Sequence, residues 1–183
     1  MALVGQRQGR DERVQVLKPQ DIVVCLDMAL HGDRRSYAAI AVHLHMSVGA
    51  AHAAVQRSIE AQLLDDAGKP IVANLIEFLI HGVRYAFFAK LGRTTRGVST
   101  GVSAPGAKDL LTFQPERVWV WPDPRGDVRG QSVKPLFPTV PRAASACNML
   151  HLGLAMIDLL RVGSARERAV AAVALETQLR LRS

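Results

Sequence analysis

The sequence predicts a mainly helical α+β protein, with helices toward both ends of the chain and short β-strands in Pro/Gly-rich surroundings between them. Apolar residues recur at spacings of three and four from about position 19 to 81 and again over the last 40 positions, which is the period of an amphipathic helix. Tyr85–Phe88 and Arg117–Trp121 are rich in aromatic and β-branched residues and indicate short strands. Most of the prolines fall between Pro105 and Pro141, which predicts largely irregular chain there.

Length and composition restrict the class of protein. The 183 residues are 49% hydrophobic and 21% charged, which suits one compact domain, or a small domain with an appendage. The net charge of +7 favours an acidic partner, with nucleic acid first and an anionic membrane surface second. The two cysteines, Cys25 and Cys147, form no metal motif and no disulfide framework, so we expect a reducing, cytoplasmic setting. With no apolar run near ~18 residues and no signal-peptide pattern, we expect neither membrane insertion nor secretion.

Local signals place four helices in the N-terminal half. Pro19 begins the first, which ends at Gly32. Ser36 caps a short helix over 37–44, and Ser47 caps a longer one that runs to about residue 62. A fourth helix is expected from Pro70 to His81, with Gly82 as its stop.

The remaining elements are expected further along the chain. Residues 90–106 suit an extended loop or hairpin tip. A helix over 143–162 ends at Gly163, and a capping box of Ser164 and Glu167 opens the last helix. The last helix carries an apolar stripe of Val170, Val173 and Leu181 that must pack against the core or against a second copy of the chain.

The segment Ser36–Leu64 has the layout of a helix-turn-helix, in which a short helix and a longer one flank the turn His45-Met46-Ser47. Leu17–Leu64 resembles the winged helix-turn-helix of bacterial MarR-like transcription regulators. The resemblance is carried by LKPQDIVVCLDMAL, Ala41, Met46-Ser47, Val55-Gln56-Arg57 and Leu63-Leu64. It implies a cytoplasmic, usually homodimeric, sequence-specific DNA binder without enzymatic activity. The family usually has glycine at the turn position of His45, so His45 is expected to adopt a left-handed backbone.

Two groups of residues are candidates for DNA contact. In the first group, Arg57 and Gln56 are predicted to read base edges, His52 a base or phosphate, and the amides behind Ser47 a phosphate. Its members are Ser36, Tyr37, Ser47, Val48, Gly49, Ala50, His52, Ala53, Gln56 and Arg57. The second group is a wing-like loop in a stretch with five basic residues and no acid, from Gly82 to Lys108. Its members are Lys90, Arg93, Thr94 and Arg96, which we expect to reach a minor groove or phosphates.

Other chemistries find little support in the sequence. His43, His45 and His52 lie close together but lack a Cys or carboxylate at metal-ligand spacing, so we expect no metal there. The glycine-rich stretch Gly92–Gly106 lacks the Lys-Ser/Thr ending of a nucleotide loop. No Gly-x-Ser-x-Gly nucleophile motif occurs, and we expect no enzyme and no cofactor. We expect Trp119 and Trp121 to lie in the core. A subunit contact or a small-ligand pocket remains an alternative for one of the two.

The working hypothesis is therefore a sequence-specific DNA-binding regulator, a homodimeric repressor associated with the nucleoid. It divides the chain into a flexible basic arm (1–16), a helix-turn-helix domain with a wing-like loop (17–106), a Pro-rich segment (107–142) and dimerising C-terminal helices (143–183). Two alternatives stay open. One is a helix-turn-helix that binds a protein, as an antitoxin-like partner does. The other is a sensor whose 85–121 region binds a small-molecule effector.

Overall fold

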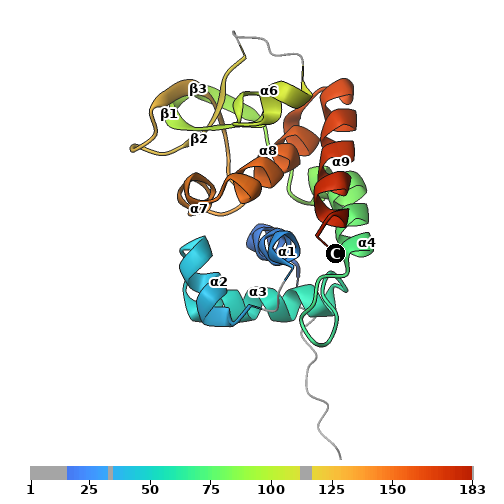
Figure 1. The fold of residues 1–183 in the computed structure, drawn as a ribbon. Helices are drawn as coiled ribbons and strands as arrows, with labels where there is room; N and C mark the ends of the chain where they lie inside the picture. The colour runs from blue at the N-terminus through green and yellow to red at the C-terminus, as the bar shows by residue number, and fades with distance from the viewer. Residues whose placement is uncertain (1–15, 33–34, 112–116, 183) are drawn as a thin grey trace, which may run out of the picture.

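The computed structural model describes residues 16–32, 35–111 and 117–182. This part of the chain is mainly helical, with one small three-stranded sheet. In Figure 1 the sheet lies at one end of the molecule and α2 and α3 lie at the other, with α1, α7 and α8 between them. The elements are α1 (Pro19–His31), α2 (Tyr37–Leu44), α3 (Val48–Glu60), α4 (Val72–Glu77), the π-helical turn η1 (Phe78–Gly82), α5 (Val83–Ala86), β1 (Leu91–Thr100), the 3₁₀ turn η2 (Gly101–Ser103), α6 (Ala107–Leu110), β2 (Trp119–Pro122), β3 (Val128–Val133), α7 (Val140–Ala146), α8 (Asn148–Val162) and α9 (Ala165–Arg180).

The helix ends follow the local signals of the sequence. Gly32 closes α1 in the left-handed region at φ +68°, and its N–H donates to the Met28 carbonyl at 3.2 Å. The hydroxyls of Ser36 and Ser47 cap α2 and α3 as predicted. Ser164 and Glu167 form the predicted capping box of α9. These features need only neighbouring residues, which is why the sequence shows them.

Helix α1 is the centre of the core. Every residue from Asp21 to Leu30 is buried, because α1 packs against α2 and α3 on one side and against α8 and α9 on the other. The buried side chains of α1, α3, α4, α8 and α9 belong to one continuous hydrophobic cluster. Helices α1 and α3 and the C-terminal helices therefore share a core, and the predicted boundaries at 106 and 142 remain predictions.

The fourth helix is longer than the sequence predicts. Gly82 was expected to stop it, but Gly82 is helical at φ −105° and the helix continues through η1 and α5 to Ala86. The Phe78 ring lies 2.9 Å from where a Gly82 Cβ would stand, so this glycine gives room for a ring rather than ending a helix. The predicted strand Tyr85–Phe88 is consequently wrong, since Tyr85 and Ala86 end a helix.

The sheet differs from the predicted loop and irregular segment. Residues 91–100 form a strand, and β3 lies in the stretch expected to be irregular. Strand β1 pairs antiparallel with both β2 and β3, and β2 pairs parallel with β3, so the three strands close on themselves. Glycine allows this close packing: a Cβ on Gly97 would lie 2.0 Å from the Trp121 carbonyl oxygen, and one on Gly130 would lie 2.4 Å from that of Val118. Trp119 and Trp121 are both buried in the core.

The C-terminal helices also depart from prediction. The expected helix over 143–162 begins earlier, at Val140, and breaks at Cys147 into α7 and α8. In α9 the residues that face the core are Ala171, Leu175 and Leu179. The predicted stripe lies on another face: Val173 is 67% exposed and Leu181 is 78% exposed. With Leu110 and Leu152 that stripe lines an apolar groove of about 670 Å³.

Among the described residues, none of the helices taken singly has the length and apolar character needed to cross a membrane. Helices α2 and α3 meet those criteria when taken together, but the chain bends by 110° between them.

Candidate nucleic-acid interface

The α2–turn–α3 unit has the geometry of a helix-turn-helix. The chain turns by 110° between the two helices, within the range that this motif uses. His45 makes the turn in the left-handed region, at φ 52° and ψ 47°, as its position in the resemblance predicts. The Met46 N–H donates to the Ala41 carbonyl at 3.0 Å, Ala41 is buried, and α2 packs against α3. The small alanine thus permits the close packing that fixes this angle.

Serine hydroxyls define where both helices of this unit begin. The Ala39 N–H donates to Ser36 Oγ at 3.2 Å, and the Ala50 N–H donates to Ser47 Oγ at 3.1 Å. Both caps are exposed, and they leave other first-turn N–H groups of each helix facing solvent. A helix N-terminus of this kind attracts the negative charge of a phosphate.

The N-terminal half of α3 is accessible from solvent. Val48 is 53% exposed and His52 is exposed, while Ala53 and Gln56 are half-buried. Tyr37 of α2 contacts His52 edge-to-face, with ring centroids 4.9 Å apart. A Cβ on Gly49 would meet nothing within 4 Å, so the chain leaves open space there. Of the predicted group, Tyr37 and His52 are in contact, and the residues that are exposed or half-buried are Ser36, Tyr37, Ser47, Val48, Gly49, Ala50, His52, Ala53 and Gln56.

Arg57 is the exception, and its predicted outward position is wrong. It is 6% exposed, and its Nε and Nη2 donate to the two carboxylate oxygens of Asp21 at 2.7 and 2.5 Å. Hydrogen bonding to this carboxylate raises the pKa of Arg57 above its ordinary value. Asp21 is fully buried in α1, so the pair joins α3 to the central helix. Arg57 positions α3 and has no free donor fork for a base.

The predicted wing is not beside α3. Lys90, Arg93, Thr94 and Arg96 belong to β1 or its start and are exposed, but the sheet lies at the end of the molecule opposite α3 (Figure 1). The intervening α4–η1–α5 helix carries the chain away from the helix-turn-helix before β1 begins. The basic segment therefore forms a separate surface.

That second surface concentrates positive charge. Arg96 of β1 is the direct antiparallel partner of Arg129 of β3, and Thr94 is the partner of Gln131. All four side chains are exposed, and directly opposed like charges destabilise a sheet unless something neutralises them. Within the described part of the chain, neither guanidinium makes an ion pair. We call Thr94, Arg96, Arg129 and Gln131 the sheet-end cation surface.

A nearby arginine shows the contrasting arrangement. Arg125 Nη2 lies 3.1 Å from Asp123 Oδ2, and the Arg125 backbone N–H donates to Asp123 Oδ1 at 2.8 Å. These hydrogen bonds from Arg125 lower the pKa of Asp123. The turn before β3 thus pairs its own arginine with a carboxylate, whereas the described residues supply no carboxylate to Arg96 or Arg129.

Comparison with known proteins gives no family assignment: no family model, no curated protein and no solved structure matches this chain. The winged helix-turn-helix resemblance therefore stays a prediction that depends on the residues and geometry described above.

Proposed function

We propose that the protein is a sequence-specific DNA-binding regulator that inserts the N-terminal half of α3 into a major groove. The observation that carries the proposal is the 110° turn that leaves Val48, Gly49 and His52 exposed at the capped start of α3. His52 and Gln56 supply polar contacts to base edges, and Ala50 and Ala53 suit thymine methyl groups. Ser36, Tyr37 and Ser47 stand beside this face for phosphate contact.

The sheet-end cation surface supplies the salt-dependent part of DNA affinity. Its arginines lie far from α3 in the fold, so they serve nonspecific phosphate binding rather than a wing contact beside the recognition helix. This division assigns sequence preference to one end of the molecule and electrostatic attraction to the other.

The regulator acts as a homodimer in the cytoplasm, associated with the nucleoid, and represses its operator. The Val170/Val173/Leu181 stripe supports a two-fold contact between copies, because Val173 and Leu181 are exposed and line an apolar groove that the described part of the chain leaves open. We expect Val173→Glu to shift a dimer to a monomer in sedimentation experiments, with the fold unchanged. Ala165→Glu, at an exposed position before this stripe, is the control and should leave the dimer intact. A wild-type monomer at micromolar concentration would contradict the dimer.

The direct test is fluorescence-anisotropy binding to the DNA upstream of the protein's own gene, against a shuffled duplex, at two salt concentrations. The proposal predicts a preference for the native fragment that persists at the higher salt. Equal binding to both duplexes that disappears with salt would leave only the cation surface and would contradict a sequence-specific regulator.

A protein-interaction module is the second candidate, and exposed aromatic side chains favour it. Tyr85 is 73% exposed and Phe88 is 71% exposed, and both lie beyond the helix-turn-helix. Moreover, α3 contains no Lys and no Arg other than the buried Arg57. Failure of DNA binding together with co-purification of a stoichiometric partner would favour this function.

A further inference from the structure

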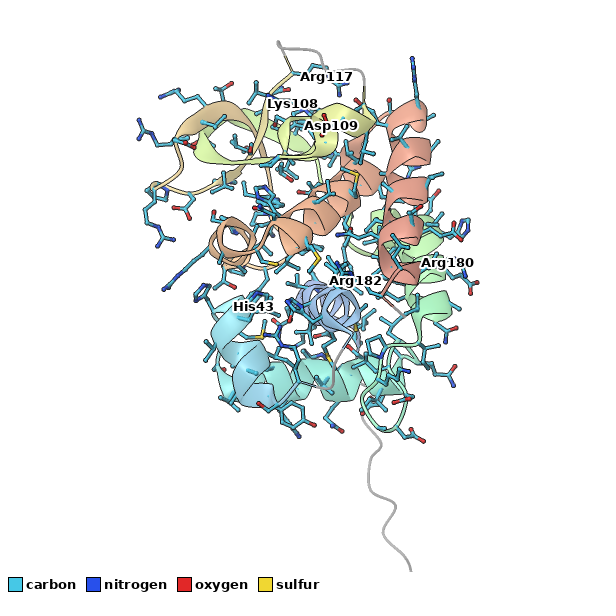
Figure 2. All side chains as sticks on the ribbon, in the orientation of Figure 1. His43, Lys108, Asp109, Arg117, Arg180 and Arg182 are labelled. Atoms are coloured by element: carbon cyan, nitrogen blue, oxygen red, sulfur yellow. The ribbon has the colours of Figure 1, made fainter. Side chains whose placement is uncertain are left out.

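Three potential metal ligands meet where α1, α2 and the α7–α8 junction come together. His31 is the last residue of α1, His43 lies in the last turn of α2, and Cys147 separates α7 from α8. A ring nitrogen of each histidine and the Cys147 Sγ lie within 4.8 Å of one another, and all three residues are half-buried. Figure 2 shows His43 at the end of α2 that faces α7. These residues are distant in sequence and form no motif.

Asp27 orients both histidine rings. Its carboxylate is fully buried, and Oδ1 lies 2.7 Å from His43 Nδ1 and 3.3 Å from His31 Nδ1. His31 Nδ1 is also 2.8 Å from the Asp27 backbone carbonyl. Carboxylate and carbonyl oxygens accept hydrogen bonds, so both Nδ1 atoms carry the proton in the neutral rings. Each Nε2 is then left with a lone pair to donate to a metal ion.

This arrangement is the support that metal-binding histidines require. A carboxylate that accepts from the remote nitrogen fixes the ring and raises its basicity as a ligand. Within the described residues, the polar contacts of the two rings all involve Nδ1, and neither an Nε2 atom nor the Cys147 Sγ makes a hydrogen bond. With the proton on His43 Nδ1, the approach of Arg35 Nη1 to that atom at 3.2 Å is a contact between two donors and not a hydrogen bond. The hydrogen bonds from the Nδ1 atoms to Asp27 thus orient the two rings. The Nε2 atoms and the Cys147 Sγ, which would bind the metal ion, stay free of hydrogen bonds within the described residues.

The local charge permits a divalent cation. Arg35 Nη1 lies 2.9 Å from Asp27 Oδ2 and 3.2 Å from His43 Nδ1. The Asp27 carboxylate offsets this guanidinium, and loss of the Cys147 proton on metal binding adds a thiolate directly at the site.

We propose that His31, His43 and Cys147 form a Zn²⁺ site, with the fourth position open to water or another small ligand. Two imidazole nitrogens and one thiolate match the donor preference of Zn²⁺, a borderline-soft ion that accepts tetrahedral coordination. Tetrahedral Zn–N and Zn–S bonds place ligand atoms about 3.3–3.6 Å apart. A ring nitrogen of each histidine and the Cys147 Sγ lie within 4.8 Å of one another, so the three ligands must move closer together to bind one ion.

Metal binding would join α2 to both α1 and the α7–α8 junction. Because α2 packs against α3, Zn²⁺ bound here would restrict the α2–α3 pair relative to the core. Any effect on DNA affinity rests on the proposed function, but the metal site itself does not. The site is therefore tested without DNA.

The experiment is a Co²⁺ titration of the metal-free full chain, followed by displacement with Zn²⁺. We expect one Co²⁺ per chain, with visible ligand-field bands and a near-ultraviolet thiolate-to-cobalt band, both removed by one equivalent of Zn²⁺. Cys147→Ser should abolish the thiolate band, and His31→Gln and His43→Gln should each weaken Co²⁺ binding by at least about tenfold.

Matched controls keep this test decisive. His45→Gln and His52→Gln remove the neighbouring histidines and should leave binding unchanged, and circular dichroism should show that every metal-free variant is folded. If Cys147→Ser fails to fold, the two Gln variants carry the test alone. Absence of the thiolate band in the wild type, or equal Co²⁺ affinity in folded His31→Gln and His43→Gln, would overturn the site. Loss of DNA binding with an intact cobalt spectrum would overturn only the proposed function.

Discussion

The two ends of the molecule use arginine in opposite ways. At the helical end, Arg57 is buried against the Asp21 carboxylate and holds α3 on α1. At the sheet end, Arg96 and Arg129 face each other across two strands in solvent. Breaking the first arrangement would leave a buried charge without its partner, whereas the second places like charges opposite each other, which costs stability. The sequence predicts that both Arg57 and Arg96 contact DNA. In the structure Arg57 is a buried structural residue, and Arg96 remains a candidate for phosphate binding.

Arg57→Ala should have the largest effect, and it should be on stability. Removing the guanidinium leaves the Asp21 carboxylate buried without its partner, which costs about 3–5 kcal/mol of unfolding free energy. Urea denaturation measures this loss, with the exposed Arg166→Ala as the matched control. A folded Arg57→Ala with wild-type stability and altered base preference would restore Arg57 as a base-reading residue.

The paired change His52→Ala/Gln56→Ala should act on sequence preference. We expect the free-energy difference between binding to the native and the shuffled duplex to shrink by about 1–3 kcal/mol per lost base contact. Unfolding free energy should change little, since His52 is exposed and Gln56 is only half-buried. Anisotropy at fixed salt measures the difference in binding free energy. His81→Ala, which removes another exposed histidine, should preserve it.

Arg96→Ala/Arg129→Ala should weaken binding to both duplexes alike. Each lost phosphate contact removes about 0.9 from the slope of log affinity against log salt, so the double change should lower the slope by about two. Because the opposed charges are gone, unfolding free energy should stay level or rise slightly. An unchanged salt slope would show that the sheet end does not contact DNA.

The smallest expected effect is on the pH dependence of stability, through the hydrogen bond between His151 of α8 and Ser99 of β1. Burial lowers the pKa of His151, whose Nε2 donates to the Ser99 carbonyl at 2.7 Å. With the folded pKa below the unfolded value of about 6.5, the unfolded chain takes up a proton first as pH falls. Stability should therefore be full above about pH 6.5 and decline below it, by up to about 1.4 kcal/mol per pH unit.

Denaturation at pH 7.5 and pH 5.5 measures this decline. His151→Gln should reduce it, whereas His81→Gln, at an exposed position, should not. Equal pH dependence in wild type and His151→Gln would remove His151 as its cause.

The sequence predicted what local chemistry controls. Caps at Ser36, Ser47 and Ser164 and the left-handed His45 need only neighbouring residues, and all four are confirmed. The predicted helix end at Gly82 was wrong because the sequence cannot distinguish a glycine that makes room for a neighbouring ring, here that of Phe78, from a glycine that ends a helix.

Long-range pairing explains the remaining differences. The partner of Arg57 lies 36 positions away on α1, and helical periodicity carries no sign of it. Strand β3 was missed because prolines flank it, and its pairing with β1 depends on glycines that allow close approach. The His31/His43/Cys147 cluster likewise comes together only through the packing of three elements.

The central claim is that α3, and not the sheet end, enters the groove. It is tested by cross-linking from Gly49→Cys and from Gln131→Cys, each carrying a photoreactive group in a Cys147→Ser background. Open space around Gly49 accommodates the probe, and Gln131 is exposed. The account predicts base cross-links at fixed positions of the native fragment from residue 49, and scattered, salt-sensitive cross-links from residue 131. Fixed base cross-links from residue 131 and none from residue 49 would contradict it.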